Sequence, residues 1–153
     1  MNSHPENTEE LFEMAALPLN ARVIDLGAGD GCSGCDVCVD IAPRGANVIK
    51  ADFLNLPFPD ESFDAALSQC SFYTSGNPQR ALSEARRVLK TGGKLLYSDV
   101  FFSEPELPGY KLLEIRDKTA LWREYYLEML WKEDNVPVIK GSAKYYLIIA
   151  EKV

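Results

Sequence analysis

Apolar residues occur along the chain in short blocks, and each block predicts a strand or a helix. Short apolar runs predict strands at residues 23–27, 37–41, 47–53, 63–72, 94–102, 110–115 and 144–152, and the run at 63–72 is largely apolar, as expected for a strand buried on both faces of a sheet. Apolar residues at helical spacing predict helices at 6–17, from Asn77-Pro78 to Gly92-Gly93, and from 117 to about 132. Because strands alternate with helices, we expect an α/β fold with a mostly parallel sheet of seven strands.

The connection between the first two predicted strands is unusually short. Only about nine residues, 28–36, are available, and they are rich in glycine and lack a helical period. Parallel strands usually need a crossover of about a dozen or more residues that includes a helix. We therefore expect this helix to be shortened or missing, which leaves an apolar patch beside these two strands. Either the segment Leu11–Leu17 or a second copy of the chain can cover that patch, and we favour a homodimer.

Length and charge narrow the classes of protein to consider. The chain has 153 residues, which fits one domain over 1–153, and Asn7 or Thr8 is expected to cap its first helix. A net charge of -7 argues against a nonspecific nucleic-acid partner, and no apolar run approaches a membrane span. Four cysteines, three of them crowded between residues 32 and 38, do not resemble a secreted disulfide framework, so we expect a cytoplasmic protein.

Residues 23–31, Val-Ile-Asp-Leu-Gly-Ala-Gly-Asp-Gly, carry the most specific chemical signal. The run Val23–Leu26 predicts a buried strand, and an acid within such a strand costs free energy unless it is paired or lies near a ligand. The glycines that follow permit a tight turn and let the backbone approach a ligand closely. This pattern indicates a ligand site at the end of the first strand.

The motif resembles motif I of the class I S-adenosylmethionine (SAM)-dependent methyltransferases, and three later segments resemble the same family in the same order. These segments are Val-Asp-Ile-Ala (39–42), Ala-Asp-Phe-Leu-Asn-Leu-Pro-Phe-Pro-Asp-Glu-Ser-Phe-Asp (51–64) and Ala-Arg-Arg-Val-Leu-Lys-Thr-Gly-Gly-Lys-Leu-Leu (85–96). The resemblance covers residues 20–102 well and is greatest to the small methyltransferases grouped with the ubiquinone and menaquinone biosynthesis enzymes. It implies a Rossmann-like sheet, SAM as cofactor, and methyl transfer to an unidentified small-molecule acceptor.

The resemblance also assigns residues to the nucleoside part of SAM. A carboxylate at the end of a parallel strand can accept hydrogen bonds from both ribose hydroxyls, and Asp40 has that place in the second strand. In the family, the acid that matches Asp52 binds the adenine amino group, and the residue that matches Phe53 flanks the adenine ring. A solvated acid at a strand end and a turn cap are the alternative interpretations of the two acids.

Further residues are assigned to the methionine part of SAM. Asp25 and the backbone of Gly27, Gly29 and Gly31 are expected to line it. The end of the fourth strand, Ser68–Gln69, is expected to offer backbone carbonyls to its amino group.

Two side chains are candidates for the catalytic step. Tyr73 follows the fourth strand and Asp99 lies in the fifth, near where an acceptor should bind. Tyr73 can hydrogen-bond the acceptor or face the sulfonium, and Asp99 can take a proton. The single histidine, His4, could act only if the N-terminal arm folds over the pocket. The segment Phe101–Gly109, with its prolines and glycine, is the best candidate for a rim around the acceptor.

Three other interpretations compete with a methyltransferase. Gly29-x-Gly31-x-x-Gly34 satisfies a dinucleotide fingerprint, but that fingerprint should open a helix and precede an acid by about 20 residues. The chain could instead be a degenerate SAM-binding or structural module that lost catalysis with its crossover helix. Cys32, Cys35 and Cys38, with Cys70 as a fourth ligand, could hold a metal, although two of these cysteines lie in predicted core strands. We expect no bound metal.

Overall fold

The computed structural model describes residues 5–31, 34–130 and 143–153. Its helices are α1 (Pro5–Ala15), α2 (Pro78–Val88) and α3 (Thr119–Leu130), with a 3-10 turn, η1, at Tyr73–Ser75. Its strands are β1 (Val23–Leu26), β2 (Val37–Asp40), β3 (Ile49–Lys50), β4 (Phe63–Gln69), β5 (Leu89–Phe101), β6 (Tyr110–Asp117) and β7 (Lys144–Lys152).

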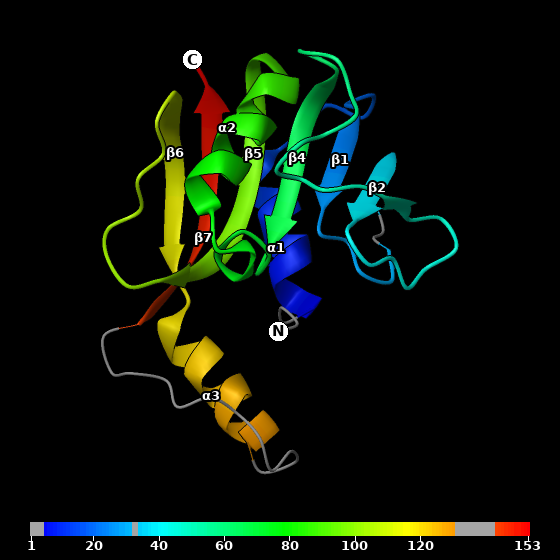
Figure 1. Ribbon diagram of the computed structural model, residues 1–153. Coiled ribbons are helices and arrows are strands. Elements are labelled where there is room, and N and C mark those ends of the chain that lie inside the picture. The colour runs from blue at the N-terminus through cyan, green and yellow to red at the C-terminus, as the bar shows by residue number, and fades with distance from the viewer. Residues whose placement is uncertain (1–4, 32–33, 131–142) are drawn as a thin grey trace.

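All seven strands form one sheet in the order β3-β2-β1-β4-β5-β7-β6 (Figure 1). The first five strands of that order run parallel, and β7 lies antiparallel between β5 and β6. The predicted fold class, an α/β sheet of seven mostly parallel strands, is therefore confirmed. The order also brings the carboxyl ends of β1, β2 and β4 to the same edge of the sheet, where ligands bind in open α/β folds.

The two faces of the sheet carry separate apolar cores, and the two best-packed helices lie on opposite faces (Figure 1). On one face, α2 buries Ala81, Leu82 and Val88 against residues of the central strands that include Leu95. On the other face, α1 buries Leu11. Successive strand residues point to opposite faces, so neighbours such as Leu95 and Leu96 belong to different cores.

The crossover between β1 and β2 contains no helix among its described residues, as the sequence predicted. Asp36, at the end of this crossover, is bonded to Val23 at the start of β1. The Asp36 carboxylate accepts the N–H of Val23, and the Asp36 N–H donates to the carbonyl of Val23, each at 2.8 Å. Phe12 of α1 lies against Gly34, within 3.7 Å of where a Cβ would stand. The N-terminal helix therefore supplies cover beside this connection.

Several predicted boundaries are wrong. The third strand is only Ile49–Lys50, not 47–53, because the chain leaves the sheet at the turn that begins near Asp52. The predicted helix after Asn77 ends at Val88 rather than at the glycines, because Leu89 is extended and pairs with Phe63.

The N-terminal and third helices also differ in detail from the sequence prediction. α1 begins at Pro5, a residue suited to the first turn, so Asn7 and Thr8 lie inside the helix and do not cap it. In α3, Trp122 is buried, whereas its neighbour Leu121 is exposed. The helix projects beyond the sheet, which limits what it can bury (Figure 1). Among the described residues, no helix is both long and apolar enough to cross a membrane.

Candidate functional site

A cavity of about 270 Å³ lies where the carboxyl ends of β1 and β2 meet the turns after β3 and β4. Four of the residues that the sequence singled out line it together, namely Gly27, Asp40, Asp52 and Phe53. The remaining lining residues are Ile41, Leu54, Ser71, Thr74 and Ser75. The cavity thus joins two carboxylates, an aromatic ring and a glycine whose backbone is accessible.

Asp40, the last residue of β2, orients the glycine-rich loop as well as lining the cavity. One carboxylate oxygen accepts the N–H of Gly29 and the other accepts the N–H of Ala42, both at 2.8 Å. These two bonds fix the carboxylate in place. An ionised carboxylate offers about four acceptor positions, so Asp40 can still accept hydroxyl donors from a ligand.

Gly27 is the glycine on which this geometry depends most. Its φ is +86°, and a Cβ at this position would stand 2.3 Å from the Oγ of Ser71. Only glycine fits such a backbone without displacing its neighbour. Gly29 and Gly31 also have positive φ, but neither lines the cavity, and the side chain of Arg44 lies over Gly29.

Asp52 and Phe53 follow β3 and form the opposite wall. One Asp52 oxygen accepts the N–H of Leu54 at 2.8 Å, which closes a turn around the carboxylate. The Phe53 ring packs on Phe72 with 5.3 Å between ring centroids, and Phe72 packs on Tyr97 at 5.2 Å. A half-buried aromatic face beside an acceptor carboxylate suits a planar ligand that carries a hydrogen-bond donor.

The side chains of three other predicted residues lie outside this cavity. Asp25 is buried within β1, on the same face of the sheet as Val23. The Ser68 side chain is fully buried. Gln69 turns towards α1, where its amide exchanges hydrogen bonds with the Thr8 hydroxyl at 2.9 and 3.1 Å.

A second cavity, of about 290 Å³, lies beyond η1 between α2 and the end of β5. Tyr73 is half exposed here, and its ring packs against Phe102 at 5.4 Å. Tyr97 and Phe101 extend the aromatic lining. Because Tyr73 faces this cavity while Thr74 and Ser75 face the first, the turn η1 separates the two.

Asp99 is only 2% exposed and lies behind this turn. Its carboxylate accepts the N–H groups of Tyr73 and Val100, each at 2.9 Å, and faces the Tyr97 hydroxyl at 3.5 Å. Burial raises the pKa of Asp99 to about 6, although these hydrogen bonds oppose the shift. The structure therefore makes Asp99 the anchor of η1, and it is not among the residues that line either cavity.

The cysteines described by the structure have different environments. Cys70 is buried against the Tyr145 hydroxyl at 3.2 Å, and burial raises the pKa of its thiol to about 11. Cys35 is half buried and Cys38 is buried in β2. Within 5–31, 34–130 and 143–153, no three histidine, cysteine or acidic residues gather as metal ligands would. Cys32 and His4, which the sequence singled out, lie outside the described residues.

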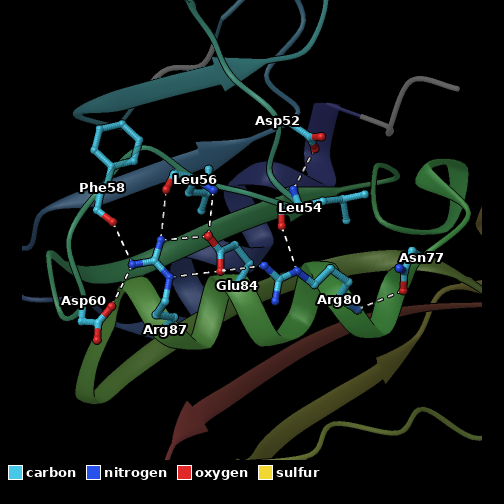
Figure 2. A network of polar contacts seen from close by, with 9 residues as sticks. All are labelled: Asp52, Leu54, Leu56, Phe58, Asp60, Asn77, Arg80, Glu84 and Arg87. Carbon is cyan, nitrogen blue, oxygen red and sulfur yellow. Dashed lines mark hydrogen bonds and ion pairs between the residues drawn. The ribbon is translucent and has the colours of Figure 1, made fainter.

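The segment that carries Asp52 and Phe53 is held by α2 and has little strand pairing of its own (Figure 2). Arg80, Glu84 and Arg87, spaced one helical turn apart, bind its backbone. Glu84 is 3% exposed, and the hydrogen bonds from Arg87 hold the pKa of its carboxyl below the usual range.

Sequence reasoning missed the polar residues of the turn after β4, Ser71, Thr74 and Ser75. They enter the cavity because Cys70 has a positive φ of 54° and redirects the chain as β4 ends. The available signal was the run of small hydroxyl residues after an apolar strand. The bond between Thr8 and Gln69 was also missed, because it links residues that lie 61 positions apart in the sequence.

Comparison with known proteins shows a match to a protein family. Residues 24–97 match the family described as "Methyltransferase domain". The demethylmenaquinone methyltransferase of Paenarthrobacter aurescens (strain TC1) is 30% identical over 152 residues, which covers 86% of this chain and 54% of that protein. The chain spans 54% to 59% of the length of the first three curated relatives that it matches.

Solved structures share the fold at low sequence identity. The geranyl diphosphate C-methyltransferase of Streptomyces coelicolor A3(2), solved with Mg²⁺, geranyl diphosphate and S-adenosyl-L-homocysteine, superposes with a TM-score of 0.75 at 19% identity, over 97% of this chain and 79% of that one. The cyclase SpnF superposes with a TM-score of 0.73 at 19% identity, over 96% of this chain and 80% of that one.

Proposed function

We propose that this chain, whose residues 24–97 match a methyltransferase domain family, binds SAM and transfers its methyl group to a small-molecule acceptor. One observation carries the proposal: Gly27, Asp40, Asp52 and Phe53, which come from three separate segments of the chain, line a single cavity. The volume of about 270 Å³ lies near the lower end of small-molecule pockets, so it suits the nucleoside part of SAM.

The residues present fit that group. We assign Asp40 to the ribose diol, because its carboxylate is already oriented by two backbone N–H groups. We assign Asp52 to the adenine amino group and the Phe53 ring to one face of the adenine. The methionine part is assigned to Gly27 and to the backbone carbonyls of Ser68–Gln69. We also keep Asp25, Gly29 and Gly31 in the proposed site for the methionine part, where they support the loop that contains Gly27.

When bound, SAM supplies an electrophilic methyl group and leaves as the neutral thioether S-adenosylhomocysteine. The protein's contribution is to position the acceptor and exclude water. We propose that the acceptor binds in the second cavity, with Tyr73 touching it as the catalytic residue. Asp99, the other candidate from the sequence, then acts by holding the Tyr73 turn through the 2.9 Å bond. A direct proton transfer to Asp99 would require the turn to move.

The acceptor class follows from the lining of this cavity. Four aromatic side chains, Tyr73, Tyr97, Phe101 and Phe102, face it. They favour an acceptor with a substantial apolar or aromatic part. Named activities of similar proteins, on demethylmenaquinone and on geranyl diphosphate, agree with an acceptor of this kind. The net charge of -7 disfavours a nucleic-acid acceptor.

Calorimetric titration with S-adenosylhomocysteine tests the cofactor assignment. We expect saturable binding to the wild type and about tenfold or weaker binding to Asp40→Asn, because a charge-assisted hydrogen bond to the diol is lost. Asp30→Asn is the matched control: Asp30 lies in the glycine-rich loop that Asp40 orients, but its carboxylate is 79% exposed and pairs with exposed Arg44. Absence of heat and of thermal stabilisation at millimolar ligand would contradict the proposal.

A degenerate SAM-binding module is the second candidate, because the shortened crossover removes a helix beside the glycine loop. The superposition on the cyclase SpnF illustrates that this fold and methyl transfer are separable. Release of S-adenosylhomocysteine from SAM with apolar phenol, thiol and amine acceptors discriminates the two. Turnover that Tyr73→Ala abolishes supports the enzyme, whereas binding without turnover supports the degenerate module.

We also propose that the chain forms a homodimer. Phe12 already lies beside the β1–β2 connection, so the contact is expected elsewhere, at the edge strand β6. Leu112, Leu113 and Ile115 of that strand are each at least 40% exposed. Edge strands with apolar side chains favour pairing with another strand. Light scattering at micromolar concentration should give a dimer mass that Leu113→Lys halves; a monomeric wild type contradicts this.

Finally, we propose that residues 1–153 act as one methyltransferase domain in the cytoplasm. A single sheet contains strands from β1 to β7, which supports one domain. The free thiols of Cys35 and Cys70 suit a reducing compartment.

A further inference from the structure

The segment 52–60 joins the cavity to helix α2. At its beginning, Asp52, Phe53 and Leu54 line the cavity. Further along, its backbone polar groups are bonded by side chains rather than by a neighbouring strand. Buried backbone groups need such partners, so the position of this segment depends on the side chains of α2.

Three α2 side chains form the attachment (Figure 2). Glu84 accepts the N–H of Leu56 at 2.8 Å, and Arg87 donates to the carbonyls of Leu56 and Phe58 at 3.0 and 2.8 Å. Arg80 donates from Nε to the carbonyl of Leu54 at 3.0 Å. The spacing of these three residues, i, i+4 and i+7, places them on one side of the helix.

Arg80 is the member of this set nearest the cavity. The carbonyl that it holds belongs to Leu54, and the N–H of the same residue donates to the Asp52 carboxylate at 2.8 Å. Arg80 is in turn steadied by Glu84, whose carboxylate lies 3.9 Å from its guanidinium. A continuous path of contacts therefore runs from α2 through Leu54 to one oxygen of Asp52, which leaves the second oxygen for the adenine amino group.

We propose that Arg80 is a positioning residue that sets the selectivity of this cavity for a 6-aminopurine. It does so by holding the Leu54 carbonyl in place, so that the Leu54 N–H keeps the Asp52 carboxylate turned towards the adenine edge. This inference rests on the proposed function, because it assumes that adenine binds against Asp52 and Phe53. It goes beyond that function by assigning selectivity to a surface residue of α2 that does not line the cavity.

The side chain of Arg80 is half exposed, so its removal leaves the core intact. Arg86 offers a matched control on the same helix. It also donates two hydrogen bonds to backbone carbonyls, those of Gly109 and Val153, at 3.1 and 2.8 Å. These partners belong to the β6 edge and the C-terminus, away from residues 52–60. Arg80→Ala and Arg86→Ala thus each remove an arginine from α2, and only the first touches the cavity wall.

The experiment compares two ligands by calorimetry: S-adenosylhomocysteine, with a 6-amino group, and S-inosylhomocysteine, with a 6-oxo group. The wild type should prefer the amino ligand by about tenfold, because the oxo group would face a carboxylate. In Arg80→Ala we expect S-adenosylhomocysteine to bind about fivefold more weakly and the preference to fall to about twofold. Arg86→Ala should keep the wild-type preference even where its melting temperature falls.

The outcomes separate the two proposals. If the wild type binds neither ligand, the proposed cofactor site falls and this inference falls with it. If the wild type prefers the amino ligand and Arg80→Ala keeps that preference, the cofactor site stands and the positioning role of Arg80 is wrong. An equal loss of preference in Arg86→Ala would also overturn it, since the effect would then come from general loosening of α2.

Discussion

The substitution Glu84→Gln tests whether α2 holds the 52–60 segment through a buried charge. The Glu84 carboxylate bonds Arg87 twice, at 2.8 and 3.0 Å, and accepts the Leu56 N–H. Glutamine keeps the size of the side chain and one acceptor oxygen. It removes the negative charge and places an amide NH₂ group where the guanidinium needs an acceptor.

The size of the expected loss of stability depends on the hydrogen-bond partners that Arg87 keeps in the variant. Breaking a buried ion pair by removing one partner costs roughly 3–5 kcal/mol. The Arg87 side chain is 32% exposed and keeps Asp60 and two carbonyls as partners, so we expect a smaller loss. We predict a decrease of about 2–3 kcal/mol in the free energy of unfolding at pH 7, or roughly 5–10 °C in melting temperature.

Urea denaturation followed by circular dichroism measures this loss. The folded-state pKa of Glu84 is lowered by its bonds with Arg87, so its contribution is complete above the ordinary pKa of 4.5. It is lost as the pH falls through the lowered folded-state value, because the wild-type carboxyl then becomes protonated. The difference between wild type and Glu84→Gln should therefore shrink towards pH 3.

Glu13→Gln is the control, because Glu13 is an exposed glutamate on α1. We expect it to change the free energy of unfolding by less than about 0.5 kcal/mol. If Glu84→Gln behaves like this control at pH 7, the buried network does not hold the 52–60 segment. If the difference in unfolding free energy between wild type and Glu84→Gln stays constant down to pH 3, the electrostatic explanation is wrong, although the network itself can still hold the segment.

Two further predictions concern the loop after β1 and the anchor of η1. Gly27→Ala should destabilise the protein by about 2 kcal/mol or more and abolish S-adenosylhomocysteine binding, because the added Cβ meets Ser71. The control Gly76→Ala, at a φ of +77° with nothing within 4 Å of the added Cβ, should destabilise the protein by only about 1 kcal/mol and keep binding. Equal losses of stability in the two variants would contradict the close approach of Gly27 to Ser71. The pKa of Asp99 is about 6 in the folded protein, above its ordinary value of 3.8. As the pH rises between these two values, the carboxyl ionises more readily in the unfolded chain than in the folded protein, which lowers the stability of the fold. The stability of the wild type relative to Asp99→Asn should thus fall by about 3 kcal/mol between about pH 4 and pH 7 in urea titrations, and a pH-independent difference would refute the assignment.

The sequence predicted the part of the site that follows from strand periodicity. Gly27 and Asp40 occupy strand ends, and parallel strands that end at one edge bring such residues together. Asp52 and Phe53 followed from the resemblance of residues 51–64 to a known motif. These four residues line one cavity, although β3 is much shorter than predicted.

The parts that sequence reasoning missed depend on contacts between distant segments. Nothing local shows that Asp99 would bond the N–H of Tyr73, 26 residues away, rather than face a cavity. The spacing of Arg80, Glu84 and Arg87 is visible in the sequence, but their partners are backbone groups of a loop about 26 to 31 residues earlier. That the Asp25 side chain lies outside the cavity likewise depends on the face of the sheet to which it points, which is the face that α1 covers.

The central claim is that the cavity at the ends of β1, β2 and β3 holds the nucleoside of SAM. A crystal structure of the protein grown with saturating S-adenosylhomocysteine tests it most directly. We predict electron density for the ribose hydroxyls within hydrogen-bond distance of Asp40, with the adenine ring against Phe53 and its amino group on Asp52. Density for the nucleoside in the aromatic cavity beyond η1, or no density at either place, would contradict the account.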